Sequence, residues 1–211
     1  MQGREIHSTP SIGIALFQGA QPSAQDLLQR ADLAMYQAKA GGRNTLCFFD
    51  PAMQAAASAR SALEGDLRQG ILREELLLHY QPVVNEAGQI LGAEALVRWQ
   101  HPERGVVFPG AFIPLAEQTG LILSLGRQVL GLACRQLARW ASDPRTSGWT
   151  VAVNVSAREF RQPDYVQQVL AVLRDSGADP RQLKLELTES LLLQEVEESI
   201  LKMQALRTLG V

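Results

Sequence analysis

The stretch EALVRW at residues 94–99 alternates like a β-strand and carries two opposite charges. Because successive side chains of a strand point to opposite faces, Glu94, Leu96 and Arg98 share one face. Burying either charge without a partner is costly. Two interpretations follow. Either Glu94 and Arg98 form an ion pair, or Glu94 is a metal ligand beside a phosphate-binding arginine.

Two later strands carry polar side chains in the same way, at residues 151–155 (VAVNV) and 183–188 (LKLELT). Their polar faces fall near strand ends that lead into helices, which is where parallel α/β folds build their sites. We therefore expect Glu94, Asn154 and Glu186 to converge. Two carboxylates and an amide oxygen suit Mg²⁺ or Mn²⁺ rather than zinc. The alternative is a purely structural set of buried polar residues.

Strands and helices alternate through most of the chain, which predicts an α/β fold with a hairpin followed by a parallel sheet. The expected strands are 76–84, 89–99, 149–156 and 183–188. The expected helices are 112–118, 125–141, one opened by Pro163 and ended by Gly177, and 189–209. A complete (β/α)₈ barrel needs about 250 residues, and only about 150 follow Ser61. We expect an incomplete TIM-like barrel, cut in mid-fold.

The first fifty residues predict a smaller strand–helix–strand unit, which cannot bury a full core alone. Ser23 and Asp26 form a weak capping box at the start of the helix. The pair Gly41-Gly42 is expected to end it in the left-handed way. The predicted strands are 11–17 and 44–49, and an alanine-rich linker helix follows at 51–74.

Composition excludes several classes of partner. The 211 residues carry a net charge of −2, so no general attraction to a nucleic acid polymer or an anionic membrane is expected. No apolar run reaches the length of a membrane span, and the first residues lack the form of a signal peptide. Cys47 and Cys134 lie too far apart for a metal or redox motif. We expect a cytoplasmic protein, or the cytoplasmic portion of a longer sensor protein.

Three pieces near the N-terminus carry a family resemblance: SIGIA at 11–15, ADLAMYQAK at 31–39 and GGRN at 41–44. Together they resemble the closing segment of a GGDEF (diguanylate cyclase) domain. The signature loop of that family lies upstream of these pieces and is not in this sequence. We therefore assign no cyclase chemistry to the chain.

Five further motifs occur in order, and they resemble the EAL-domain family of cyclic di-GMP phosphodiesterases over residues 61–211. They are QP at 81–82, EALVRW at 94–99, FIPLAE at 112–117, VNVS at 153–156 and ELTES at 186–190. The resemblance implies an enzyme of bacterial second-messenger signalling. It would hydrolyse cyclic di-GMP to linear pGpG with a metal-activated water. The expected organisation is a GGDEF remnant at 1–50, a linker helix at 51–62 and a truncated EAL domain at 63–211.

The resemblance also implies roles for individual residues. The metal ligands, to Mg²⁺ or Mn²⁺ in a two-metal site of the complete domain, would be Glu94, Asn154 and Glu186, with Glu94 also counted as catalytic. The contacts to cyclic di-GMP would be Gln81, Leu96 and Arg98. Glu189 matches a catalytic glutamate that anchors a loop near the metals. Its alternative role is that of an acid favoured at a helix N-terminus.

The family pattern continues with a paired-aspartate loop, a lysine and further glutamates, which this sequence does not contain. We therefore expect the polypeptide alone to be inactive. The alternative function is a degenerate EAL domain that binds cyclic di-GMP as a receptor without cutting it. A third possibility is a truncated product with an aggregation-prone open edge. The resemblance also allows a homodimer through the EAL domain, and His79 and His101 are expected to be structural.

Overall fold

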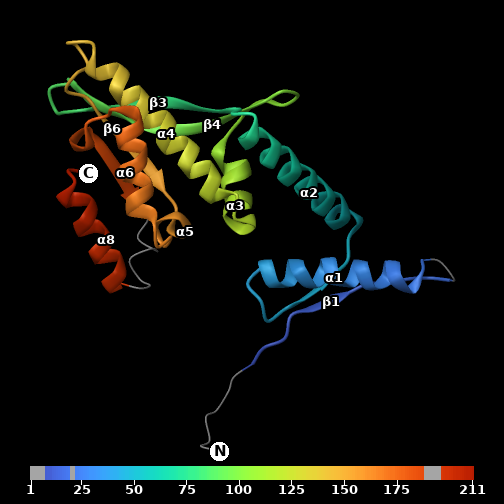
Figure 1. Cartoon of the computed structure of the whole chain (residues 1–211). Coiled ribbons are helices and arrows are strands. Elements are labelled where there is room, and N and C mark those ends of the chain that lie inside the picture. The colour runs from blue at the N-terminus through green and yellow to red at the C-terminus, as the bar shows by residue number, and fades with distance from the viewer. Residues whose placement is uncertain (1–7, 20–21, 188–195) are drawn as a thin grey trace, which may run out of the picture. The chain divides into compact units, whose positions relative to one another are not determined.

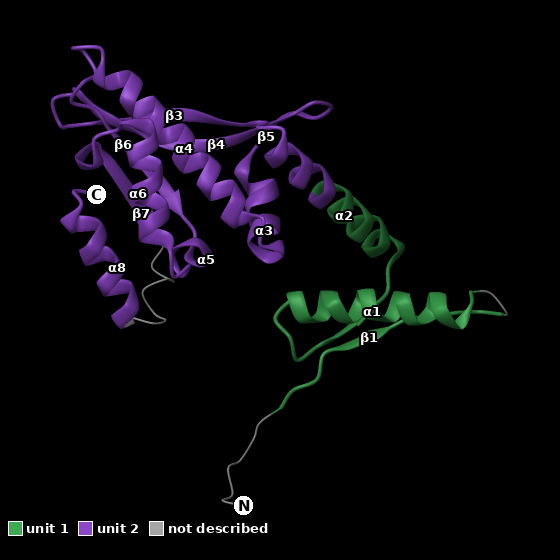
Figure 2. Ribbon diagram, viewed as in Figure 1, with its two compact units in different colours: residues 1–63 green, residues 64–211 purple. Residues whose placement is uncertain are grey.

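A computed structural model describes residues 8–19, 22–187 and 196–211 (Figure 1). The chain divides into two compact units, residues 1–63 and 64–211, which are described separately below (Figure 2). Among the described helices, none combines the length and the apolar character that crossing a bilayer requires.

In its described residues, the first unit contains two short parallel strands with a helix between them, and residues 51–63 begin the next helix. Strands β1 (Ile12–Ile14) and β2 (Leu46–Phe48) are joined through α1 (Ala24–Ala40), which contacts both strands. The predicted capping box is confirmed, since the Ser23 hydroxyl accepts from the Asp26 backbone N–H. The helix ends at the predicted pair Gly41-Gly42, with Gly41 as its C-cap at a φ of −77°. The positive φ comes one residue later, at Gly42, because the Gly41 N–H still continues the helical hydrogen bonding.

Helix α2 (Pro51–Leu72) leads into the second unit, where its last turns are fixed to the sheet. Leu67 is fully buried, and Gly70 lies directly against the Trp99 indole. The buried His101 ring accepts two backbone N–H bonds at Nδ1 and lies 3.4 Å from an Asp66 carboxylate oxygen through Nε2. These contacts give His101 the structural role that was expected of it.

The second unit is built on a mixed sheet with the order β3-β4-β6-β7, and β5 pairs with β4. Strands β3 and β4 form the predicted antiparallel hairpin, and β4, β6 and β7 are parallel as predicted. Strand β5, which is antiparallel to β4, was not predicted. The strands are β3 (Leu76–Val84), β4 (Ile90–His101), β5 (Gly105–Val107), β6 (Thr150–Val155) and β7 (Leu183–Leu187).

The helices of this unit largely follow the expected pattern. They are α3 (Pro109–Thr119), α4 (Ile122–Ala141), α5 (Ala157–Phe160), α6 (Tyr165–Ser176), η1 (Pro180–Gln182) and α8 (Val196–Thr208). Pro163 does not open a helix. It lies in the turn before α6, which begins two residues later at Tyr165 with Asp164 as its N-cap. The separate short helix α5, which starts at the capping box of Ser156, was not predicted. Helix α6 ends at Gly177, as predicted, and Gly177 adopts the left-handed conformation.

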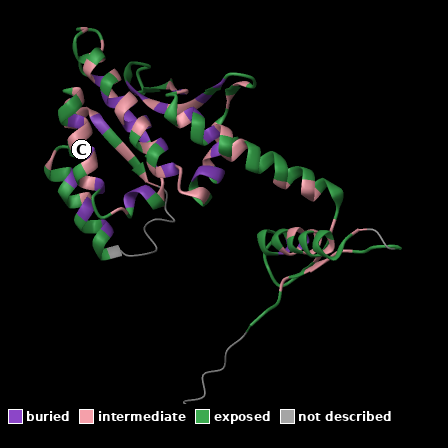
Figure 3. Cartoon of the chain, turned by 45° about the vertical axis from the view of Figure 1, so that its right-hand side comes forward, coloured by how far each residue is buried: buried purple, intermediate pink, exposed green. Residues whose placement is uncertain are grey.

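The two faces of the sheet have different surroundings. Figure 3 colours each residue by its burial and shows buried residues both in strands and in helices of this unit. Helices α3 and α4 contact the strands on the face that carries the buried valines of β6, where exposure is at most 4%. The opposite face carries the exposed polar side chains Gln81, Asn154 and Glu186. An α/β sheet with helices on its outer side and polar groups on its inner side confirms the predicted fold class.

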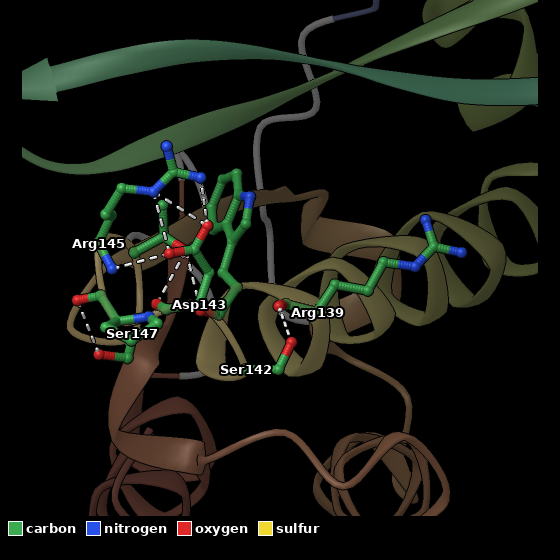
Figure 4. Close-up of polar contacts among 8 residues, drawn as sticks. Arg139, Ser142, Asp143, Arg145 and Ser147 are labelled. Carbon is green, nitrogen blue, oxygen red and sulfur yellow. Dashed lines mark hydrogen bonds and ion pairs between the residues drawn. The ribbon is translucent and has the colours of Figure 1, made fainter.

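The connection from α4 to β6 is held by its own polar contacts (Figure 4). The Asp143 carboxylate accepts from the backbone N–H and the guanidinium of Arg145, which holds the pKa of this carboxyl below its usual value. The Ser142 hydroxyl donates to the carbonyl of Arg139 at 2.7 Å. The connection is exposed, so these bonds order the loop that leads into β6 rather than the core.

Candidate functional site

The predicted metal ligands lie on one face of three adjacent strands. Glu94 of β4 is paired with Ala152 of β6. Asn154 follows Ala152 by two residues, so its side chain lies on the same face of the sheet as that of Glu94. Asn154 is in turn the direct register partner of Glu186 on β7. Side chains directly opposite each other on neighbouring strands are about 5 Å apart at Cβ. The structure therefore brings together the three residues that alternation had placed on one face.

A hydrogen bond joins the first two of these residues. The Asn154 amide nitrogen donates to Oε1 of Glu94 at 2.7 Å. A half-turn of the amide about its last torsion would present Oδ1 to the same point. Carboxylate and amide oxygens are the donors that Mg²⁺ and Mn²⁺ accept, so the donor set fits such an ion. Within the described ranges, no three His, Cys, Asp or Glu side chains form a metal cluster, so the candidate set depends on the amide.

Arg98 does not pair with Glu94. Four residues along a strand span about 13 Å, which is too far for an ion pair within the strand. Instead, Nη1 of Arg98 donates to the Val97 carbonyl at 2.8 Å, and the guanidinium carbon lies 4.9 Å from the centre of the Phe108 ring. Its Nε–H is buried and has no acceptor among the described residues. The ion-pair interpretation is therefore wrong, and Arg98 keeps an unused donor.

The remaining predicted contacts line the same face. Gln81 of β3 is exposed and is the register partner of Glu94. Leu96 shares the face of Glu94 by strand parity, and Leu96 and Asn154 are also among the residues that line a cavity of about 400 Å³ beside helices α3 and α4. His79, expected to be structural, is exposed on this face opposite Leu96. Glu189 lies outside the described residues.

Glu159 is a buried carboxylate beside the site that sequence reasoning missed. Its Oε2 accepts from the Ser156 N–H at 3.0 Å and from the Ser156 hydroxyl, while Oε1 packs over the Cα of Gly126 in α4. Burial raises the pKa of Glu159, the Ser156 bonds oppose that shift, and the nearby Glu117 adds to it. The S-x-x-E spacing at 156–159, directly after Asn154, was the available signal.

The Ser156–Glu159 capping box fixes the turn that follows Asn154. Both hydrogen-bonding partners of the box are formed, and α5 begins immediately after Ser156. Because this turn leaves the strand two residues after Asn154, its rigidity limits how that amide can move. Glu159 therefore supports the position of a candidate ligand without being one.

Comparison with known families agrees with this geometry. The family model for the EAL domain matches residues 64–211. The model for the diguanylate cyclase GGDEF domain matches residues 1–45. These two matches cover the two resemblances drawn from the sequence motifs.

Among individual proteins, the chain is 43% identical over 208 residues to the bifunctional diguanylate cyclase/cyclic di-GMP phosphodiesterase MucR of Pseudomonas aeruginosa. It is 36% identical over 206 residues to the cyclic di-GMP phosphodiesterase PdeR of Escherichia coli. Each alignment covers 98% of this chain but only 30% of MucR and 31% of PdeR. The chain thus spans about a third of the length of these relatives.

A solved structure described as the PaMucR phosphodiesterase in complex with c-di-GMP superposes with a TM-score of 0.68 at 42% identity. The superposition covers 71% of this chain and 61% of that one. The same fold therefore holds this ligand in a similar protein.

Proposed function

Because the chain belongs to the EAL domain family, we propose that it forms part of a phosphodiesterase that hydrolyses cyclic di-GMP to linear pGpG. The names of MucR and PdeR and the ligand of the PaMucR structure support this substrate. The observation that carries the proposal is the convergence of Glu94, Asn154 and Glu186 on one open face of the sheet.

In this proposal the three oxygen-bearing side chains hold Mg²⁺ or Mn²⁺. Such an ion lowers the pKa of water towards neutrality and neutralises charge on phosphoryl oxygens. Glu94 and Glu186 supply two negative charges, and Asn154 adds a neutral oxygen that lets a dianionic substrate approach. Glu189 is proposed to anchor a neighbouring loop.

Arg98, Gln81 and Leu96 are proposed to hold the substrate. Arginine binds phosphate oxygens through paired N–H donors. Arg98 carries a buried Nε–H that finds no acceptor in residues 8–19, 22–187 and 196–211, and such a donor costs about 1–3 kcal/mol. A small shift of the side chain towards a phosphate oxygen would recover that cost. Gln81 offers an amide beside Glu94, and Leu96 offers an apolar contact for a base.

We also propose that the domain works in the cytoplasm, where a nucleotide messenger and Mg²⁺ or Mn²⁺ are both present. A homodimer through the EAL domain remains part of this proposal.

The first test is hydrolysis of cyclic di-GMP in Mn²⁺, followed by chromatography of pGpG, with the protein in its native form. We expect turnover, and a loss of at least ~100-fold in Glu94→Ala, because one ligand of the ion is removed. Lys184→Ala is the control, since Lys184 is exposed on the same face and is not a proposed ligand. Turnover that survives Glu94→Ala contradicts the proposal.

The second test measures cyclic di-GMP binding to the 211-residue chain by calorimetry, with Mn²⁺ and with chelator. We expect binding that depends on Mn²⁺ and weakens in Glu186→Ala. Binding without any turnover in the native protein would favour the receptor function. Absence of binding both in the native protein and in the 211-residue chain would refute the proposed function.

A further inference from the structure

The Phe108 ring is an exposed aromatic group placed against the substrate-binding arginine of the proposed site. Its relative exposure is 62%, among the highest of the large apolar side chains in this unit. An aromatic ring in that position gains little from burial. The centre of the ring lies 4.9 Å from the guanidinium carbon of Arg98, within the distance at which a cation interacts with a ring face.

The backbone fixes this placement. Strand β5 pairs with β4 so that Val107 is opposite Trp99 and Val106 is opposite Gln100. Phe108 follows directly and therefore comes beside Arg98. The next residue is Pro109, which restricts Phe108 to an extended conformation, and its φ and ψ are −84° and 152°. Phe108 also occupies the N-cap of α3 without making a side-chain cap bond there.

The arginine has few other restraints. Its Nη1 donates a hydrogen bond to the Val97 carbonyl. Its Nε has no acceptor in the described part of the chain. A guanidinium held by one bond can rotate about its last torsions. A ring 4.9 Å from the guanidinium carbon restricts that rotation and leaves the other N–H donors for an acceptor.

We propose that Phe108 is a positioning residue that holds the plane of the Arg98 guanidinium, so that its donor edge meets a phosphate group of the cyclic dinucleotide. This proposal rests on the proposed function. The phosphate binds to Arg98, and Phe108 acts through Arg98. A preordered guanidinium loses less rotational freedom when the phosphate arrives, so the gain appears as affinity.

The test measures the affinity of the chain for cyclic di-GMP in Phe108→Ala, Phe108→Leu and Phe108→Tyr. We expect Phe108→Ala to weaken binding about 3- to 10-fold, the range of an arginine–ring interaction. Tyrosine keeps the ring face and should restore binding. Leucine keeps the apolar bulk but has no ring face, so it should behave like alanine. Full restoration by leucine would overturn the proposal, because bulk alone would then suffice.

A double-mutant comparison separates positioning from direct stacking of Phe108 on a base. On an Arg98→Ala background, Phe108→Ala should cost nothing further, because the residue it positions is gone. An equal loss on both backgrounds would mean that Phe108 contacts the ligand itself, and it would overturn the inference. In the native enzyme, the loss in Phe108→Ala should appear in KM rather than kcat.

The same variants distinguish a failure of the proposed function from a failure of the positioning role of Phe108. If Arg98→Ala leaves affinity unchanged, the proposed function fails at this residue. If Arg98→Ala weakens binding and Phe108→Ala does not, only the positioning role fails. Urea midpoints within error of the parent chain show that each variant is folded, and an exposed position should meet that condition.

Discussion

Replacing Gly126 with alanine should destabilise the protein, although the same change in a helix normally stabilises it. Gly126 lies within α4, and Oε1 of Glu159 occupies the space that a Cβ would need. The carboxylate cannot simply retreat, because its other oxygen is bound to the N–H and hydroxyl of Ser156. Alanine at this position must therefore displace a buried, hydrogen-bonded group.

The magnitude follows from opposing contributions. Alanine gains about 1 kcal/mol over glycine in a helix interior. Overpacking a filled site costs about 2 kcal/mol. Loss of one bond between Ser156 and Glu159 adds about 1 kcal/mol. The net expectation is a loss of about 2 kcal/mol, which corresponds to a fall of ~1 M in the urea midpoint for a typical slope.

The assay is urea unfolding followed by tryptophan fluorescence. All three tryptophans, Trp99, Trp140 and Trp149, lie in the second unit, so the signal reports on the unit that contains the change. Gly131→Ala is a matched control in the same helix. The nearest atom to a Cβ at Gly131 is the flexible end of Arg135, so we expect this variant to gain up to about 1 kcal/mol.

Removing the obstructing side chain should reverse the effect. On a Glu159→Ala background, Gly126→Ala should gain about 1 kcal/mol, which gives a coupling of about 3 kcal/mol, the upper part of the usual range for residues in contact. If Gly126→Ala instead stabilises the parent chain as much as Gly131→Ala does, Glu159 does not pack over this helix. The account of a fixed capping box beside Asn154 would then be refuted.

Three further predictions follow. Burial raises the pKa of Cys134 to about 11, so near pH 8 Ellman's reagent should modify Cys47 quickly and Cys134 slowly; equal rates would contradict its burial. Glu159 has a raised pKa, so the folded state holds its proton longer and stability falls as pH rises. Glu159→Gln should flatten that decline, seen in urea midpoints from pH 4 to 8. Gly70→Ala should cost about 1–3 kcal/mol, because a Cβ there would overlap the Trp99 indole.

The long strands and the helices were predictable because each carries a sustained pattern. Strand β3 has the predicted bounds, and the parallel order of β4, β6 and β7 follows from helices between strands. The errors fall on short elements. Strand β5 has three residues and α5 has four, too few for any periodicity to emerge. The helix assigned to start at Pro163 begins two residues later, at Tyr165, because Asp164 is its N-cap.

In the candidate site, too, the features that follow from a sustained strand pattern were predictable and the others were not. Convergence of Glu94, Asn154 and Glu186 could be predicted because strand parity and parallel pairing fix which side chains share a face. Contacts between different helices and strands could not be predicted. The contact of Phe108 with Arg98 depends on the register of an unpredicted strand, since nothing in the sequence of either segment indicates that they meet.

Strand β4 joins the stability of the second unit to its proposed chemistry. Its outward Trp99 is fully buried, donates to Glu75 at 3.1 Å and packs on Gly70. Its inward residues include Glu94 and Arg98. A slip of one residue would exchange the two faces, burying both charges and exposing the indole, so the buried face determines the register. The contacts that keep Trp99 in place therefore also aim the carboxylate and the guanidinium at the open side of the sheet.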